Sequence, residues 1–363
     1  MSRRTRALIL GCAALVLGGG VRAGDDAAAL VAAMSQALRT LNYEGTFVHL
    51  QGSTVSSMHI VHANDGRGER ERMTSLDGEA REVIRDHSLV TCIWPGSGAV
   101  VRSKSRPRRL LPNVDAALAR NPSYVFALAG TDRVAGLATD VVEIRSRDGY
   151  RYGYRFWIDS ATRMLLRSML LDGERTVEQV MFTSIAYPES IDLARFEVDV
   201  DEDHVRWVEP VGARARAGSV PDLELPGLGS NDGRDTFAEL DALRTKAPEA
   251  SAENGAGDAT TASARVRFET LPNGYRTLSA NARKMGSGDA PLTHVMVSDG
   301  MASVSVYVDH LPAGEQDTSV AGFSSMGAMN AYGLSLDSGF VTVVGEVPAD
   351  TVRAIAEAVR LLD

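Results

Sequence analysis

The spacing of apolar residues changes near position 42 of the chain. Between Asp25 and Leu41, apolar side chains recur every three or four residues, as they do on an amphipathic helix. From Asn42 onward the period changes to two, and glycine-containing turn sequences interrupt it at short intervals. Alternation broken by such turns is typical of antiparallel strands joined by tight hairpins, which we therefore predict through Gly96.

The stretch YRYGYRFWIDSATRMLLRSMLLDGERTVEQVMFTSI, residues 150–185, predicts a three-stranded meander. Two turn sequences, DSAT and DGE, separate three runs rich in apolar residues. In the first strand, alternation places three aromatic side chains on one face and two arginines on the other. The aromatic residues are Tyr152, Tyr154 and Phe156, and the arginines are Arg151 and Arg155. Before this meander, a helical interruption is predicted over residues 113–130.

A change of composition at residues 209–264 separates the two parts of the chain. This stretch is rich in Ala, Gly, Ser, Pro and Asp, so we predict a largely flexible linker between two domains. Beyond it, alternating runs predict a smaller domain that begins near Arg265 and ends in a helix after Pro348. The expected strands cover 265–270, 292–300, 302–311, 330–339 and 340–347, and the apolar face of the helix comprises Val352, Ile355, Val359 and Leu362.

The first residues have the layout of a secretory signal peptide. Three arginines precede an apolar run at 7–17, and the sequence Val-Arg-Ala follows it. We therefore predict a signal peptide over residues 1–23, cleaved after Ala23, and export of the mature chain. Lipidation at Cys12 is an alternative, although only about five apolar residues precede that cysteine. No later run of about 18 apolar residues predicts a membrane-spanning helix.

The net charge limits the classes of partner. Cleavage would remove four of the 38 Lys and Arg residues and none of the 47 acidic residues, which leaves a net charge of −13. Such an acidic chain argues against general nucleic-acid binding, which needs a basic surface. One basic cluster interrupts it: RSKSRPRRL contains Arg102, Lys104, Arg106, Arg108 and Arg109. We interpret this cluster either as an anion contact, for an acidic partner or lipid phosphates, or as a solvated loop.

The sequence offers no complete catalytic or metal-binding motif. His59 and His62 differ by three positions, which places them on opposite faces of a strand. The acidic segment that begins at Asp199 resembles the start of a calcium loop, but His204 stands where glycine is needed. GFSSMG, residues 322–327, departs from the nucleophile-elbow motif of hydrolases. We therefore predict a protein that is not an enzyme and needs no metal or cofactor, with a hydrolase built on a dispersed triad as a distant alternative.

Several segments resemble, in order, the recurring motifs of the RseB/MucB family of periplasmic sigma-E regulators. These segments are LNYEGTFVH, LDGEAREVIRD, DRVAGL, RDGYRYGYRFWID, SDGMASVSVYV and TVVGEVPADTVRAIAEAV. Each is weak alone, but together they cover nearly the whole chain apart from the linker. The segment FWIDSATRMLLRSMLLD is also similar to the wider class of lipoprotein-sorting proteins with the LolA/LolB fold.

The resemblance implies an α+β fold that is mainly antiparallel β. It implies a curved, LolA-like half-barrel sheet with covering helices at 24–208, the linker at 209–264, and a small α+β domain at 265–363. It also implies a role as a periplasmic negative regulator of the sigma-E envelope-stress response. In that role the protein binds the periplasmic domain of a membrane-anchored anti-sigma factor of RseA or MucA type and protects it from regulated proteolysis. Lipid or lipopolysaccharide acyl chains that enter the half-barrel are expected to release the partner.

A half-barrel of this kind needs apolar side chains on its concave face. The candidates for lipid or partner contact are Phe47, Met58, Ile60, Tyr152, Tyr154 and Phe156. The same pattern describes an ordinary sheet core, so both interpretations stay open. A periplasmic carrier of lipoproteins or lipids is the alternative function, and the sequence leaves open whether identical chains form an oligomer.

Overall fold

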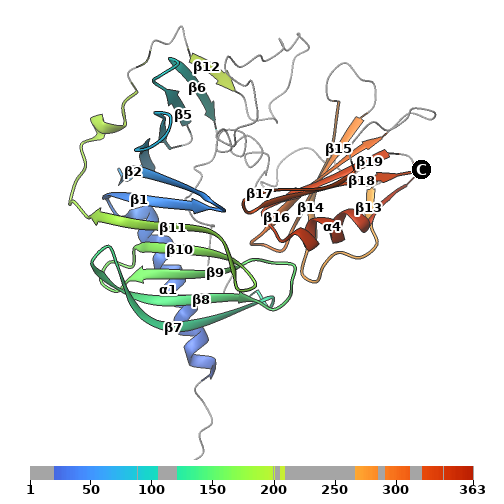
Figure 1. Ribbon diagram of the computed structural model, residues 1–363, viewed down its shortest axis with the longest axis horizontal. Helices are drawn as coiled ribbons and strands as arrows, with labels where there is room; N and C mark the ends of the chain where they lie inside the picture. The colour runs from blue at the N-terminus through green and yellow to red at the C-terminus, as the bar shows by residue number, and fades with distance from the viewer. Residues whose placement is uncertain are drawn as a thin grey trace, which may run out of the picture.

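The computed structural model describes two sheet domains and one long N-terminal helix (Figure 1). The described residues are 20–87, 89–104, 121–198, 200, 205–208, 266–284, 291–310, 321–337 and 339–362. Most of the predicted signal peptide, the predicted linker, and the calcium-like positions from Asp199 to His204, apart from Val200, lie outside these residues. None of the helices that the structure describes is long and apolar enough to cross a membrane.

The N-terminal domain is built on one 12-stranded sheet, in the order β12-β6-β5-β4-β3-β2-β1-β11-β10-β9-β8-β7. Neighbouring strands are antiparallel except for β12, which runs parallel to β6. In Figure 1 the strands turn from nearly horizontal at β7 to steep at β5 and β6, so the sheet is strongly curved. The strand bounds are β1 Tyr43–Gln51, β2 Thr54–Asn64, β3 Glu69–Ser75, β4 Glu82–Asp86, β5 Leu89–Trp94, β6 Ala99–Lys104, β7 Tyr124–Val134, β8 Leu137–Ser146, β9 Gly153–Asp159, β10 Leu165–Asp172, β11 Arg175–Ala186 and β12 Val205–Val208.

Helix α1, Gly20–Thr40, lies across one face of this sheet. Its buried side chains pack against apolar residues of β8, β9 and β10. The contacts include Ala27, Val31 and Met34 from the helix, and Val142, Ile144, Phe156, Ile158 and Leu165 from the sheet. On the opposite face, the short helix η2, Leu193–Phe196, places Phe196 against Val61 and Ala63.

The meander predicted for residues 150–185 is confirmed as β9, β10 and β11. The DSAT turn is closed by Asp159, whose carboxylate accepts hydrogen bonds from the Ala161 backbone and the Thr162 hydroxyl. Two details of the prediction are wrong. Strand β9 begins only at Gly153, so Arg151 and Tyr152 precede it and do not follow its alternation. The helical interruption is also wrong over 124–130, where the chain forms β7 instead.

The C-terminal domain holds a six-stranded antiparallel sheet in the order β14-β15-β16-β19-β18-β17, covered on one face by helix α4. Their bounds are β14 Arg276–Lys284, β15 Pro291–Ser298, β16 Ser303–His310, β17 Gly322–Met326, β18 Met329–Leu336, β19 Gly339–Gly345 and α4 Ala349–Glu357. The sequence pattern missed β14 and β17. It also extended the helix too far, because Val359–Leu361 is strand β20 and pairs with β13, Val266–Phe268.

Candidate functional site

Five of the six candidate lining residues share one face of the N-terminal sheet. The register pairs Phe47 with Met58 on β2 and with Phe182 on β11, so these side chains lie on the same side. The next residues along that face are Val180, Ser168 and Phe156, which are paired in turn across β11, β10 and β9. Ile60 and Tyr154 follow by alternation. This is the face against which α1 packs.

The helix-covered face is tightly packed. Phe47, Ile60 and Phe156 are each 0% exposed. Beside the C-terminal end of α1, a cavity of about 40 Å³ is lined by Leu38, Tyr43, His62, Glu71, Phe182 and neighbouring residues. That volume has room for roughly three water molecules and not for an acyl chain. A lipid could therefore reach these side chains only if α1 or its packing partners moved.

Tyr152, the sixth candidate, lies elsewhere. Its hydroxyl donates to the carbonyl oxygen of Ala328 at 3.0 Å and accepts from Nδ2 of Asn330 at 3.0 Å, and both partners belong to the C-terminal domain. Its ring packs with Val177 and Ala328. Burial raises the pKa of Tyr152 to about 12, so its hydroxyl keeps its proton. The side chain thus joins the two domains instead of lining the helix-covered face.

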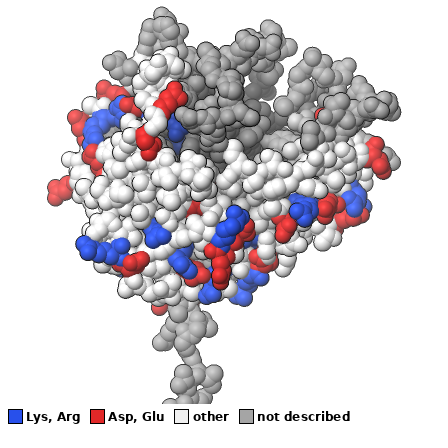
Figure 2. Space-filling model, in the orientation of Figure 1, with Lys and Arg blue, Asp and Glu red and all other residues white. Residues whose placement is uncertain are grey.

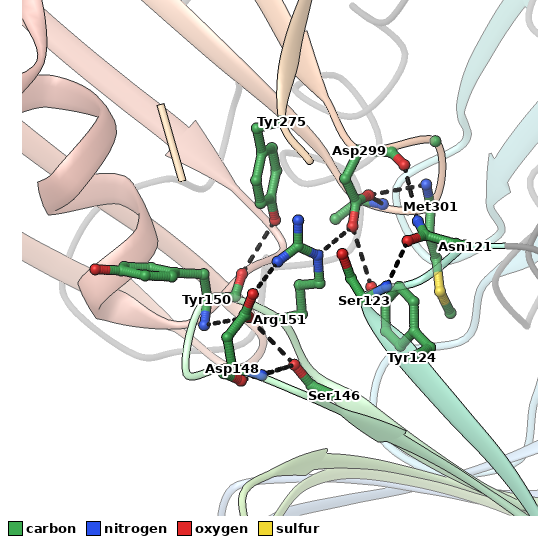
Figure 3. A network of polar contacts seen from close by, with 12 residues as sticks. Asn121, Ser123, Tyr124, Ser146, Asp148, Tyr150, Arg151, Tyr275, Asp299 and Met301 are labelled. Atoms are coloured by element: carbon green, nitrogen blue, oxygen red, sulfur yellow. Dashed lines mark hydrogen bonds and ion pairs between the residues drawn. The ribbon is translucent and has the colours of Figure 1, made fainter. Parts of the chain in front are cut away.

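Arg151 stands at the centre of the same junction (Figure 3). Its Nε donates to Oδ2 of Asp299 at 2.5 Å, and both side chains are 0% exposed. The guanidinium also donates to the Asp148 carboxylate and to the carbonyl oxygen of Asn273. It lies 4.6 Å from the ring centre of Tyr275. Burial lowers the pKa of Arg151, but the hydrogen bond and charge of Asp299 outweigh it, so the pKa is raised and the side chain stays charged.

Four further hydrogen bonds extend this contact, which we call the interdomain clamp. Asp299 accepts from Nδ2 of Asn121 through its carbonyl oxygen at 3.0 Å and from the Tyr124 hydroxyl through its carboxylate at 3.4 Å. The backbone carbonyl of Tyr150 accepts from Tyr275 at 3.1 Å and from Thr351 at 3.0 Å. Figure 3 shows Asn121, Tyr124, Tyr275 and Asp299 gathered around Arg151 from both domains. The clamp defines one mutual orientation of the two sheets.

A glycine is required next to the clamp. Gly274 has φ +84°, a conformation that other residues rarely adopt. A Cβ at this position would lie 3.0 Å from Nη2 of Arg151 and 3.2 Å from Oγ of Ser123. At a second contact between the domains, Gly327 leaves space for the side chain of Gln51 from the β1–β2 hairpin. Both glycines therefore permit close approach between the domains.

The predicted basic cluster is divided by the structure. Arg102 lies in β6, is 9% exposed, and donates from Nε to the Thr91 hydroxyl at 3.3 Å, so it is not part of a solvated loop. Lys104 ends the same strand, while Arg106, Arg108 and Arg109 lie outside the described residues. On the face shown in Figure 2, basic and acidic side chains of the described residues lie side by side.

The described residues also contain no group of three or more His, Cys, Asp or Glu side chains that could hold a metal ion. Four of the described histidines, His49, His59, His62 and His87, pair with carboxylates or backbone. His49 lies 2.8 Å from Glu178, and His59 lies 3.1 Å from Glu44. GFSSMG, the segment compared with the nucleophile elbow, forms β17 and the turn after it.

Comparison with known proteins matches both domains to the same family. The family model described as the MucB/RseB N-terminal domain matches residues 26–200, and the one described as the MucB/RseB C-terminal domain matches residues 260–360. The sigma-E factor regulatory protein RseB of Salmonella typhimurium is 26% identical, over 98% of this chain and 96% of its own. The sigma factor AlgU regulatory protein MucB of Pseudomonas aeruginosa is 25% identical, over 98% of each chain.

Solved structures show the same fold. The MucB chain in a MucA/MucB complex from Pseudomonas aeruginosa is similar with a TM-score of 0.60 and 23% identity, over 93% of this chain and 99% of that one. A second structure, of MucB with MucA(peri), gives a TM-score of 0.60 over 93% of this chain and all of that one. The predicted fold class, mainly antiparallel β with a separate C-terminal sheet domain, is confirmed. From its helix-covered curved sheet to its small C-terminal domain, the chain belongs to the MucB/RseB family.

Proposed function

We propose that this protein is a periplasmic regulator of an envelope-stress sigma factor. In this proposal it binds the periplasmic domain of a membrane-anchored anti-sigma factor of RseA or MucA type and protects that domain from regulated proteolysis. The observation that carries the proposal is the match, over both domains, to relatives named as sigma factor regulatory proteins. Those relatives are regulators and not enzymes, so we expect no catalytic turnover from this chain.

The interdomain clamp supports a binding role. A partner that touches both domains pays less conformational entropy when their orientation is already set, which favours affinity. The buried Arg151–Asp299 pair and the Tyr152 hydrogen bonds supply that orientation in the free protein. We infer that the partner binds across both domains in the orientation that the clamp maintains.

Release by lipid is the second part of the proposal. Each buried methylene contributes about 0.8 kcal/mol, so an acyl chain with ten buried methylenes could gain up to about 8 kcal/mol. A protein partner with micromolar affinity gains about 8.2 kcal/mol. Because the helix-covered face has a cavity of only about 40 Å³, the lipid must bind a form in which α1 has shifted. A lipid that binds only this form competes with any partner that needs the closed form.

The test uses the chain from Gly24 onward and the periplasmic domain of an anti-sigma factor of RseA or MucA type from the same organism. We expect a complex in the micromolar range or tighter by calorimetry, and weakening as lipopolysaccharide is added. Deacylated lipopolysaccharide is the control, because it retains the sugar and phosphate groups but lacks the chains. Failure to form any complex would overturn the binding proposal. Unchanged affinity at saturating lipopolysaccharide would overturn only the release step.

A further inference from the structure

Strand β17, Gly322–Met326, forms one edge of the C-terminal sheet. Its sequence, Gly-Phe-Ser-Ser-Met, contains no charged residue and no proline, and its pairing with β18 is regular. Four of its five residues are exposed. Natural sheets usually protect an exposed edge with a charge, a proline or a bulge, because unpaired N–H and C=O groups attract further strands. Strand β17 has none of these features.

The other edges of the two large sheets are protected, as far as the structure describes them. Strand β14, at the opposite edge of the same sheet, has a bulge between Thr277 and Ser279 and an exposed arginine at position 276. Strand β7, at one edge of the N-terminal sheet, has a bulge between Leu128 and Thr131. At the other edge, β12 is only four residues long. Open pairing groups are therefore a particular property of β17.

The hairpin geometry indicates which backbone groups of β17 point outward. Strands β17 and β18 are joined by a two-residue turn that begins with Gly327 at φ +60°, as in a type II′ turn. Such a turn is closed by hydrogen bonds between its flanking residues, here Met326 and Met329. Bonded and non-bonded pairs then alternate along an antiparallel hairpin. The N–H and C=O groups of Phe323 and Ser325 therefore point away from β18, toward the free edge.

The side chain of Phe323 indicates what an added strand would contact. It ends a row of cross-strand neighbours on the face that α4 covers, which comprises Ala280, Val295, Val306, Val343, Tyr332 and Phe323. The first four are buried and Tyr332 is partly buried, whereas Phe323 is 48% exposed. An apolar side chain on an added strand would continue this row and cover Phe323. On the other face β17 presents Ser324, so apolar residues are needed only at alternate positions of the added strand.

Strand β17 also lies beside the contact between the two domains. Gly327, in the turn after it, leaves space for the side chain of Gln51, the last residue of β1. Figure 1 accordingly shows β17 beside the ends of β1 and β2. A strand added to β17 would thus end near the β1–β2 hairpin, within reach of both domains. A second copy would have to bring a six-stranded sheet to this place, whereas an extended segment needs only the width of one strand, about 4.8 Å.

We propose that β17 is a docking edge for an extended segment of a bound polypeptide, which adds to the C-terminal sheet as a further strand. The segment exchanges backbone hydrogen bonds with Phe323 and Ser325 and places an apolar side chain against the Phe323 ring. Backbone bonds supply affinity for any extended chain, and the alternate apolar positions supply the selectivity. The assignment of this segment to the periplasmic domain of the anti-sigma factor rests on the proposed function.

The test measures amide hydrogen exchange in β17 by ¹H–¹⁵N NMR. It uses the chain from Gly24 onward, alone and with the periplasmic domain of an anti-sigma factor of RseA or MucA type from the same organism. In the free protein, the amides of Phe323 and Ser325 should exchange faster than that of Ser324, which bonds to β18. In the complex, exchange of both outward amides should slow about tenfold or more, because each gains a hydrogen bond.

The outcomes separate this inference from the proposed function. A complex in which both outward amides still exchange rapidly would overturn β17 as the docking edge and leave the proposed function intact. Failure to form any complex would overturn both. Slow exchange of these amides in the free protein would also overturn the inference, because β17 would already have a partner. That partner would be a second copy if the protection increased with protein concentration.

Two substitutions examine the edge by calorimetry. Phe323→Lys places a charge at the free edge and should weaken the complex about tenfold or more. Leu278→Lys is the matched control, on the opposite edge strand β14 with 41% exposure, and should leave the affinity unchanged. Ser325→Pro removes an outward N–H without removing a bond to β18, and should also weaken the complex. Thermal unfolding shows whether each variant is folded, and equal affinities for the two lysine variants would overturn the inference.

Discussion

Nε of Arg151 lies 2.5 Å from Oδ2 of Asp299, across 148 residues of sequence, and water reaches neither side chain. Asp299 is a residue of the C-terminal domain, whereas Arg151 precedes a central strand of the N-terminal one. A buried ion pair of this kind is strongly destabilised when one partner is removed, because the other charge is left unpaired. The clamp should therefore be sensitive to a single substitution.

Replacing Asp299 by Asn should lower the free energy of unfolding by about 3 kcal/mol, because a buried guanidinium loses its charged partner. Chemical denaturation measures the loss. Asp172→Asn is the control, since Asp172 pairs with Arg175 at the surface, with exposures of 35% and 70%. That variant should lose less than about 1 kcal/mol. Equal losses in the two variants would contradict a stabilising clamp.

Cutting the connection between the domains tests the clamp directly. A protease site placed within residues 209–264 should yield two fragments that co-elute in gel filtration, because the clamp holds them without the covalent link. The same fragments carrying Asp299→Asn should separate at micromolar concentration. Separation of the unsubstituted fragments would show that the connection, and not the clamp, keeps the domains together.

Gly274→Ala should destabilise the protein by about 1–2 kcal/mol from its positive φ, with a further loss from the methyl group pressing on Arg151. Gly78→Ala separates these contributions, because Gly78 has φ +66° with no atom within 4 Å of an added Cβ. Thermal unfolding of both variants gives the comparison. Gly78→Ala should lose less stability than Gly274→Ala. The reverse order would show that an added methyl group at Gly274 does not press on Arg151.

Phe47→Ala distinguishes a packed core from an open lipid-binding wall. Phe47 is 0% exposed and packs with Met58, Ile60 and Phe182, so truncation should cost about 3–5 kcal/mol. Phe323→Ala, on β17 with 48% exposure, should cost less than about 0.5 kcal/mol. Urea denaturation of both variants measures the two losses in the free energy of unfolding. A loss below 1 kcal/mol for Phe47→Ala would mean that its side chain lines open space in solution.

Glu44 should make stability depend on pH in acid. Two hydrogen bonds from Arg195, at 2.7 and 2.8 Å, hold the pKa of Glu44 at about 2, below its usual 4.5. The folded form therefore binds this proton less readily, and the pair stabilises the fold above pH 4.5. This stabilisation, about 1 kcal/mol for a partly exposed pair, should fade between pH 4.5 and 2. Arg195→Met should remove it, so parent and variant should differ at pH 6 and converge near pH 2.

The spacing of apolar residues predicted most strands of the N-terminal domain, but it did not predict the contact between Tyr152 and the C-terminal domain. The meander and the first hairpins follow alternation within a few residues, so the sequence contains all that is needed to locate them. In the sequence, Tyr152 and Tyr154 are spaced like neighbouring residues on one face of a strand. Tyr152 is nevertheless drawn toward Ala328 and Asn330, because Arg151 beside it pairs with Asp299 far along the chain. The period of apolar residues along a strand carries no information about a contact between residues 148 positions apart.

The sequence did contain an indirect signal for the clamp. Asp148 and Arg151 lie in RDGYRYGYRFWID, and Asp299 lies in SDGMASVSVYV. These are two of the segments that carried the family resemblance. Their shared feature, a charged turn before a strand, indicates a role beyond packing. Strand β20 was missed for a different reason, since Val359 continues the helical spacing of α4 and only its pairing with Phe268 identifies it as a strand.

Strand β12 joins the sheet beside β6, at the edge far from β9 and the clamp. The described part of the N-terminal domain therefore ends at one edge of the sheet, whereas the Arg151–Asp299 pair lies near the other. The contacts that orient the two domains are therefore distinct from the segment that joins them. The composition of residues 209–264 predicts a flexible linker, and doubling the length of such a linker would cost only about 0.6 kcal/mol while Arg151 and Asp299 stay paired. We therefore expect changes in the length of this segment to leave the mutual orientation of the two domains unchanged.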